Sequence, residues 1–285
     1  MLTLGLDNKP VLSYETFSKL REFVYARCGI SLGDAKKYFL ESRLMHRLEE
    51  RGLKSFDEYY YFLMYDTDRG KEVSSMISVV VTNETSFFRD PNQLNGFRKA
   101  VVPRILDVKK NGAAKKICIW SSACSTGEEP YTLAMLLMED SLHLTGWGIE
   151  IIGSDISDNV LKSAAAAAYD RYSVRNAPPD CLNKYFVNTG ERYTVKKQVQ
   201  DMVKYRKINL LEPLDTRMVR EMDAVFCRNV RIYFDDAAKK KVVGHLYDSL
   251  VRGGYLVLGF SESIHNITRL FRPVNINGTL VYQKM

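Results

Sequence analysis

Polar side chains directly follow short apolar runs in this sequence, and such positions are where parallel strands present binding groups. Asp155 ends the run 150–155 (EIIGSD), and the polar segment 227–234 (CRNVRIYF) follows the apolar run 222–226. In nucleoside-binding α/β folds, an acidic residue at a strand end accepts hydrogen bonds from ribose hydroxyls. The alternative is that Asp155 caps the next helix. Because residues 157–159 (SDN) offer other caps, the sequence favours ribose binding.

A second candidate binding segment is the loop 120–130 (WSSACSTGEEP), whose small residues let a ligand approach the backbone at a helix start. It has a single glycine and therefore matches neither the GxGxxG fingerprint nor the P-loop. That argues against a dinucleotide dehydrogenase and against an ATPase. Glu128 and Glu129 stand where the helix dipole favours carboxylates, and they would suit a ligand's ammonium group. An ordinary strand–helix loop is the alternative interpretation.

Residues 82–90 (TNETSFFRD) combine hydroxyl, amide and guanidinium groups with aromatic side chains, which is unusual for a plain linker. Arg89 can bind a carboxylate with two parallel hydrogen bonds. The alternative is that Phe87 and Phe88 anchor the segment in a core and that Arg89 pairs only with Asp90. Tyr233, in the other polar segment, offers a hydroxyl that can contact a substrate or a sulfonium group.

The composition is that of an ordinary globular protein, with 46% hydrophobic and 26% charged residues. No run approaches the ~18 apolar residues of a membrane span, and the start lacks the pattern of a secretory signal. The five cysteines form no CxxC pair and the four histidines are scattered, so no metal site is expected. We therefore expect a cytoplasmic chain without membrane insertion or metal. The net charge of +7 suggests an acidic partner, such as a protein surface, an anionic substrate or nucleic acid.

The elements that must position these residues fall into two regions. Residues 1–80 show helical periodicity and no convincing strand, which predicts an all-α domain. Residues 81–95 are expected to be a linker that contributes to the ligand site, and residues 96–285 alternate strands with helices. That alternation predicts an α/β domain with a mainly parallel sheet, whose ligands bind beyond the carboxyl ends of the strands. A strand, turn and returning strand near 185–205 predict a small inserted β-subdomain.

Several segments occur together in a fixed order that resembles the CheR family, the methyltransferases of bacterial chemotaxis receptors. The matching stretches are 82–90, 125–131 (STGEEPY), 154–155, 209–211 (NLL), 226–234 and 259–263 (GFSES). The resemblance covers the chain from about residue 13 to its end. It implies a Rossmann-like class I methyltransferase domain with a β-subdomain, preceded by the all-α domain. The implied reaction converts receptor glutamate side chains into methyl esters and S-adenosylmethionine into S-adenosylhomocysteine.

The resemblance also implies residue roles. The positions that correspond to cofactor contacts in the family are Asn83, Thr85, Arg89, Glu129, Asp155, Asn209, Leu210, Arg228 and Asn229. Tyr233 corresponds to a residue near the transferred methyl group, and we assign catalytic roles to Arg89 and Tyr233. Arg231 departs from the family, because its position is usually apolar; it either alters the pocket wall or reaches solvent. In some family members the β-subdomain captures a peptide from the end of the receptor.

A basic stripe is a candidate for receptor docking. It consists of residues spaced by four, four and three positions beside an apolar helix face, namely Arg43, Arg47, Arg51 and Lys54. Such a stripe would complement a helical receptor bundle that carries glutamates. A solvated helix face is the alternative. The chain is expected to act as a monomer on this partner.

Two other functions compete with carboxylate methylation. A nucleic-acid methyltransferase commonly uses an Asn/Asp-Pro-Pro-aromatic segment after the relevant strand, but residues 227–234 hold no proline. Basic patches interleaved with aromatic residues, which stack nucleic-acid bases, are also absent. A non-catalytic regulator that senses S-adenosylmethionine would show the same ligand residues. A glutamate carboxylate is already ionised at neutral pH, so the favoured reaction needs no general base.

Overall fold

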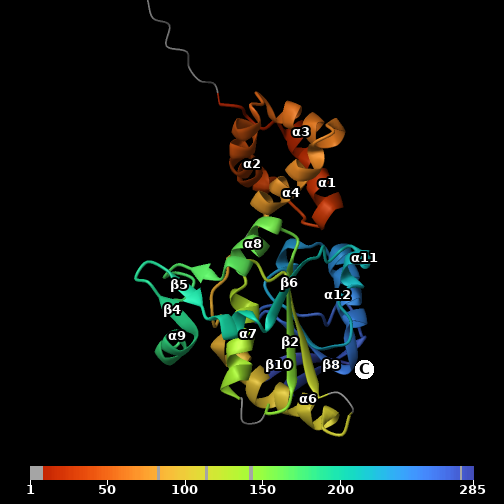
Figure 1. Ribbon diagram of the computed structural model, residues 1–285. Helices are drawn as coiled ribbons and strands as arrows, with labels where there is room; N and C mark the ends of the chain where they lie inside the picture. Colours follow the sequence, from red (N-terminus) through yellow and green to blue (C-terminus); the bar gives the residue numbers. More distant parts are fainter. Residues whose placement is uncertain (1–8, 82–83, 113–114, 141–143, 277) are drawn as a thin grey trace, which may run out of the picture. The chain divides into compact units, whose positions relative to one another are not determined.

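The computed structural model describes residues 9–81, 84–112, 115–140, 144–276 and 278–285. The chain divides into two compact units, residues 1–82 and 83–285, which are described separately (Figure 1). None of the described helices is both long and apolar enough to cross a membrane.

The first unit is helical, as expected. Its helices are α1 (Tyr14–Cys28), α2 (Lys37–Arg51), α3 (Phe56–Tyr65) and α4 (Arg69–Val80). The side chains of Ser13 and Ser55 accept hydrogen bonds from backbone N–H groups and so cap α1 and α3. Gly52 ends α2 in the left-handed conformation, where a glycine fits without strain. Asp34–Lys36 form a 3-10 turn directly before α2.

The second unit is built on a seven-stranded sheet in the order β6-β2-β1-β7-β8-β10-β9. Its strands are β1 (Lys116–Ser122), β2 (Gly148–Asp155), β6 (Val203–Lys207), β7 (Met222–Cys227), β8 (Leu250–Leu258), β9 (Phe271–Ile276) and β10 (Thr279–Lys284). The first five strands in that order are parallel, whereas β10 is antiparallel to both β8 and β9. The carboxyl ends of β1, β2 and β7 therefore meet at one edge of the sheet, where ligands bind in such folds.

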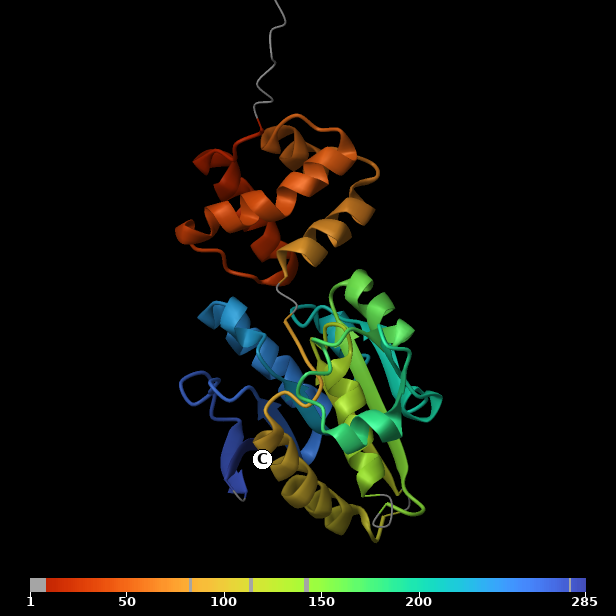
Figure 2. The same cartoon turned by 90° about the vertical axis from the view of Figure 1, so that its left-hand side faces the viewer.

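Helices cover both faces of the sheet and bury its apolar strands. The helices of this unit are α5 (Pro91–Gly96), η2 (Phe97–Val101), α6 (Val102–Lys109), α7 (Glu128–Glu139), α8 (Asp158–Ala166), α9 (Pro179–Tyr185), α10 (Lys197–Gln200), α11 (Pro213–Thr216), η3 (Arg231–Tyr233) and α12 (Asp236–Ser249). In Figure 1, α7 and α12 lie on opposite sides of the strands, and Figure 2 views the unit from the α7 side. Each face has its own core: Leu133 of α7 lies in one cluster and Val242 of α12 in the other.

The β-subdomain is a separate three-stranded antiparallel sheet in the order β3-β5-β4. Its strands are β3 (Ala168–Tyr169), β4 (Phe186–Asn188) and β5 (Tyr193–Val195). The predicted strand, turn and returning strand correspond to β4 and β5. The subdomain also recruits β3, which precedes the predicted range and is too short to be recognised from sequence periodicity. The rest of that range contains α10 and the start of β6, which belongs to the main sheet.

Candidate functional site

The loops at the carboxyl edge of the sheet hold unusual backbone conformations. Ala123 and Ser125 after β1, and Asn229 after β7, have φ values of 56°, 50° and 58°. Phe88 and Asp90, in the segment that precedes α5, have φ values of 53° and 59°. Non-glycine residues adopt this left-handed region rarely and at an energetic cost, and they cluster at functional sites. Five of the seven such residues described in the chain thus lie in the segments singled out by sequence.

Asp155 occupies the end of β2 and is only 4% exposed. Its carboxylate accepts hydrogen bonds from the backbone N–H groups of Ser125, at 2.9 Å, and Ser157, at 3.0 Å. Burial raises the pKa of the Asp155 carboxyl above its ordinary value, against the opposing effect of these N–H groups. The helix-cap alternative is not what the structure shows, because the Ser157 hydroxyl accepts the N–H of Val160 at the start of α8.

The residues around Asp155 fit a ligand that carries hydroxyl groups. A carboxylate offers about four acceptor positions, so Asp155 keeps acceptor capacity after binding the two loops. The Oγ atom of Ser125 is buried and has no hydrogen-bond partner in the described structure. An unpaired buried hydroxyl is costly, and a ligand is one way to satisfy it.

Asn209 and Leu210 lie next to Asp155. The N–H of Ile208 donates to the Asp155 carbonyl at 3.0 Å, which places the following turn beside the end of β2. Within that turn the Asn209 side chain accepts the N–H of Leu211 at 3.1 Å. The Leu210 carbonyl contacts His245 Nδ1 at 2.8 Å, which fixes the turn against α12. The structure therefore brings Asp155, Asn209 and Leu210 together.

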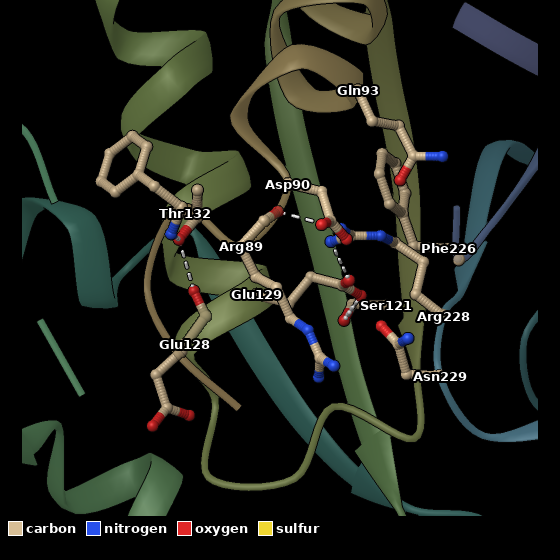
Figure 3. A network of polar contacts seen from close by, with 12 residues as sticks. Arg89, Asp90, Gln93, Ser121, Glu128, Glu129, Thr132, Phe226, Arg228 and Asn229 are labelled. Atoms are coloured by element: carbon tan, nitrogen blue, oxygen red, sulfur yellow. Dashed lines mark hydrogen bonds and ion pairs between the residues drawn. The ribbon is translucent and has the colours of Figure 1, made fainter. Parts of the chain in front are cut away.

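Arg228 is the centre of a polar network that joins three segments (Figure 3). Its guanidinium donates to Glu129 Oε2 at 3.0 Å, to Asp90 Oδ2 at 2.6 Å and to the carbonyl of Arg89 at 2.9 Å. The Ser121 hydroxyl donates to the other oxygen of Glu129 at 2.7 Å. The Arg228 side chain is only 3% exposed. Because charge-assisted hydrogen bonds are strong and directional, this network fixes β7, α7 and the 84–90 segment against one another.

Arg89 extends its own side chain away from that network, on the side where Figure 3 shows the Asn229 amide. Its Nη1 donates to the carbonyl of Glu84 at 2.9 Å. Asp90 pairs with Arg228, so the alternative in which Arg89 pairs with Asp90 is not observed. Phe87 and Phe88 are buried, as expected of core anchors.

The family resemblance implied cofactor contacts for two further positions in the segment 82–90. Thr85 is half-buried, three residues before the left-handed Phe88. Asn83 lies outside the described residues, so the structure does not place it.

Residues 231–233 form the short helix η3 after β7, and this turn inverts the expected burial. Arg231 is 3% exposed and donates from Nη2 to the carbonyl of Ser263 at 2.9 Å, whereas Ile232 is 59% exposed. Of the two alternatives for Arg231, the one in which it reaches solvent is not observed. Tyr233 is half-buried at the end of this turn. Glu262 binds the backbone of the same segment, and the sequence signalled it only as part of the stretch 259–263.

Gly127 and Gly153 line a narrow space filled by Tyr205 of β6. A side chain at Gly127 would bring its Cβ within 2.5 Å of the Tyr205 hydroxyl, and Gly127 has a φ of 92°. A Cβ at Gly153 would meet the Tyr205 ring at 2.7 Å. The single glycine of the 120–130 loop is thus required by both space and backbone conformation. The glycine is visible in the sequence, whereas its close approach to Tyr205 is visible only in the folded chain.

The basic stripe lies in the helical unit, where two of its members have internal partners. Glu72 of α4 is fully buried and accepts hydrogen bonds from Arg47, Arg51 and Tyr59 at 2.7–3.0 Å. Burial alone would raise the pKa of Glu72, but these hydrogen bonds hold it below its ordinary value.

Arg43, Arg51 and Lys54 are exposed, and of these three Arg51 is the one that binds Glu72. The guanidinium of Arg43 lies 5.3 Å from the centroid of the Phe39 ring. The stripe is therefore not uniform: Arg47 and Arg51 hold α2 to α4, and Arg43 and Lys54 face solvent.

No group of three or more His, Cys, Asp or Glu side chains within the described residues is arranged to hold a metal ion.

Comparison with known proteins identifies related chains. Residues 83–279 match the family model of the CheR methyltransferase SAM binding domain, and residues 15–80 match that of the CheR methyltransferase all-alpha domain. Chemotaxis protein methyltransferase 2 of Vibrio cholerae is 34% identical over 97% of this chain and 95% of its own length. Chemotaxis protein methyltransferase 1 of Pseudomonas aeruginosa is 34% identical over 94% and 97%, respectively. A chemotaxis protein methyltransferase of Borreliella burgdorferi is 33% identical over 89% of each chain.

Proposed function

The chain belongs to the CheR methyltransferase family, and on this premise we propose that it esterifies glutamate side chains of bacterial chemotaxis receptors. S-adenosylmethionine is its cofactor, as in the family domain that it matches. The observation that carries the proposal is the pairing of Asp155, which retains acceptor capacity, with the unpartnered hydroxyl of Ser125. The proposed cellular role is adaptation in chemotaxis signalling.

The residues at the carboxyl edge suit the parts of this cofactor. Asp155 would accept the ribose hydroxyls, and the turn at Asn209 and Leu210 would border the base. Glu129 is held by Arg228 and Ser121, and its carboxylate suits the ammonium of the methionine portion. Thr85, Arg89, Arg228 and Asn229 complete the proposed contacts, together with Asn83, which lies outside the described residues.

The reaction needs little acid–base chemistry from the protein. Once bound, S-adenosylmethionine would supply an activated methyl group for transfer to a carboxylate oxygen, with S-adenosylhomocysteine as the leaving group. The acceptor is already ionised, so no side chain must remove a proton. Fixing two reactants in line can lower a barrier by up to roughly 7–11 kcal/mol, so positioning is the main contribution that we assign to the chain. Arg89 would organise the pocket, and Tyr233 would orient the attacking oxygen or the sulfonium.

Receptor docking is the second part of the proposal. Arg43 and Lys54 are exposed members of the basic stripe that do not bind Glu72, and they would meet the acidic face of a receptor's helical bundle. Arg47 and Arg51 support this surface from within, because they fix α2 through Glu72.

The test is a methyl-transfer assay with radiolabelled S-adenosylmethionine and receptor-bearing membranes, followed by treatment with alkali. We expect labelled receptor that releases its label as volatile methanol, because esters hydrolyse in alkali and N-methyl groups do not. Label that resists alkali or appears on nucleic acid would point to a nucleic-acid methyltransferase instead. Tight cofactor binding without any transfer would point to a sensor.

A further inference from the structure

Glu262 lies outside the residues assigned so far, on the loop that follows β8. It is only 9% exposed, and its carboxylate accepts three backbone N–H groups. Oε2 accepts from Asn229 at 2.8 Å and from Gly259 at 2.9 Å, and Oε1 accepts from Arg231 at 3.1 Å. One side chain therefore joins the loop after β8 to the loop after β7. This second loop carries Asn229 and Tyr233.

The fit around this carboxylate is close. A Cβ added at Gly259 would approach Glu262 Oε2 to 2.7 Å and the Asn229 nitrogen to 3.1 Å, so a larger residue there would displace one of them. The N–H of Glu262 also donates to the Gly259 carbonyl at 2.9 Å, which closes the loop on itself. This closed turn brings the Glu262 carboxylate beside the loop after β7.

Two of these N–H groups, those of Asn229 and Arg231, belong to a segment whose conformation needs support. Asn229 has a φ of 58°, a conformation that is costly for a residue with a side chain. The N–H of Arg231 starts the turn in which Tyr233 donates to the Val230 carbonyl at 3.2 Å. Bonds between an ionised acceptor and N–H groups are stronger than neutral ones, so this carboxylate can hold the segment in its strained form.

We propose that Glu262 is a positioning residue of the methyl-transfer site, which holds Asn229 and Tyr233 in place through their backbone. This rests on the proposed function, because Tyr233 is assigned there to the orientation of the reacting groups. The role requires a carboxylate. An amide presents one oxygen and one NH₂ group, so the NH₂ would face an N–H donor at either Arg231 or Asn229.

The first variant is Glu262→Gln, and its matched control is Glu221→Gln, an exposed carboxylate just before the opposite end of β7. We expect Glu262→Gln to lower kcat for receptor methylation by about ten- to hundredfold, as expected for small misplacements of reacting groups. The KM for receptor should stay within about threefold of that of the wild-type chain, since Glu262 is not assigned to docking. Glu221→Gln should leave both constants unchanged.

A double-mutant cycle separates positioning from general support of the fold. If Glu262 acts through Tyr233, Tyr233→Phe should lower kcat strongly in the wild-type background and by less than about twofold in the Glu262→Gln background, because coupled residues are not additive. Fully additive losses, or a loss of kcat that only follows the loss of folded protein in a thermal melt, would overturn the proposal. If Glu262→Gln does not fold, Glu262→Asp must give the same loss and the same non-additivity, since its carboxylate falls short of the three donors.

Amide hydrogen exchange tests the role of Glu262 without relying on methyl transfer. The amides of Asn229, Arg231 and Gly259 should exchange faster in Glu262→Gln than in the wild-type chain, and those of Glu221→Gln should not. If wild-type protein methylates no receptor, the proposed function fails, but the exchange result still decides whether Glu262 holds this segment. If exchange at these amides is unchanged, the positioning proposal fails even in an active enzyme.

Discussion

Glu72 in the helical unit and Asp155 at the end of β2 are both buried carboxylates, but their surroundings differ in one respect. Glu72 accepts four hydrogen bonds from side chains, which fills its acceptor capacity. Asp155 accepts backbone N–H groups from two loops and keeps capacity for a ligand. The pKa of Glu72 is lowered and that of Asp155 is raised. A buried charge that the fold satisfies fully is structural, whereas one that it satisfies in part marks a binding site.

The strongest test of this comparison is Glu72→Ala. Breaking a buried ion pair by removing one partner typically costs about 3–5 kcal/mol, so we expect that loss in the free energy of unfolding of the helical unit. Hydrogen exchange on the full chain should show faster exchange in α2 and α4. The affinity for S-adenosylhomocysteine, measured by calorimetry, should remain within about twofold of wild type. A large loss of affinity would contradict the purely structural role of Glu72.

Asp155→Asn should instead weaken the binding of S-adenosylhomocysteine. Removing a charged acceptor of ligand hydroxyls typically costs about 1.5–3 kcal/mol, which corresponds to an affinity for S-adenosylhomocysteine weaker by about ten- to hundredfold. Asp158→Asn, at the partly exposed start of α8, is the matched control and should bind normally. Calorimetry measures both. If Asp155→Asn binds as tightly as the control, Asp155 does not contact the ribose.

Acidification should separate the two carboxylates by their opposite pKa shifts. The pKa of Asp155 is raised above its ordinary value of about 3.9. As the pH decreases through this raised pKa, Asp155 loses the ionised form that accepts the ribose hydroxyls. The affinity for the cofactor therefore falls. The pKa of Glu72 is lowered, so its contribution to stability is complete above about pH 4.3 and is lost only as pH falls through its lower folded value.

Calorimetry and hydrogen exchange of α2 between pH 7 and pH 4 would test that order. The affinity should fall by at most about tenfold per pH unit while α2 stays protected. Asp155→Asn should remove most of the pH dependence of binding. If α2 lost its protection from hydrogen exchange at a higher pH than the one at which cofactor affinity falls, the expected order of the two carboxylates would be wrong.

The smallest effect is expected for docking. Replacing Arg43 and Lys54 together by Ala should raise the KM for receptor by about two- to tenfold, because exposed ion pairs contribute roughly 0.2–1 kcal/mol each. Cofactor affinity and the melting temperature should not change, and Lys71→Ala on α4 serves as the control. An unchanged KM would remove Arg43 and Lys54 from the docking surface.

The parts of the molecule that are local in sequence could be predicted from it. The all-α region, the mainly parallel sheet and the inserted β-subdomain follow from periodicity and alternation, and the structure confirms them. The edge strand β9 was not predicted, because it contains Pro273 and exposed polar residues instead of regular alternation. The helical segment 91–109 was also missed. Its short helices are interrupted by a π-helical turn, so no long amphipathic pattern marks them.

The residues of the candidate site could be predicted from the sequence, but most of the contacts between them could not. Asp155 and Asn229 stand at strand ends, and a strand end is visible in the sequence. The partners of Arg228 lie 99 and 138 residues away, and only the folded sheet brings them together. Arg47 was likewise assigned by its spacing to a surface stripe, but in the folded helical unit it binds Glu72 of another helix. For Arg231 the sequence left two alternatives open, a pocket wall or solvent, and η3 turns its guanidinium inward and an isoleucine outward.

The surroundings of Gly127 limit which substitutions this part of the sequence can accept. Its backbone conformation favours glycine, and the space beside it is filled by Tyr205, which also closes against Gly153. Exchanging Tyr205 for a smaller residue would remove one obstacle, but the Ala164 Cβ, 2.8 Å from a Cβ at position 127, and the φ of 92° would remain. A side chain at position 127 or 153 therefore requires changes in the residues around it, Tyr205 first among them. Libraries that randomise the cofactor loop alone should return glycine at 127.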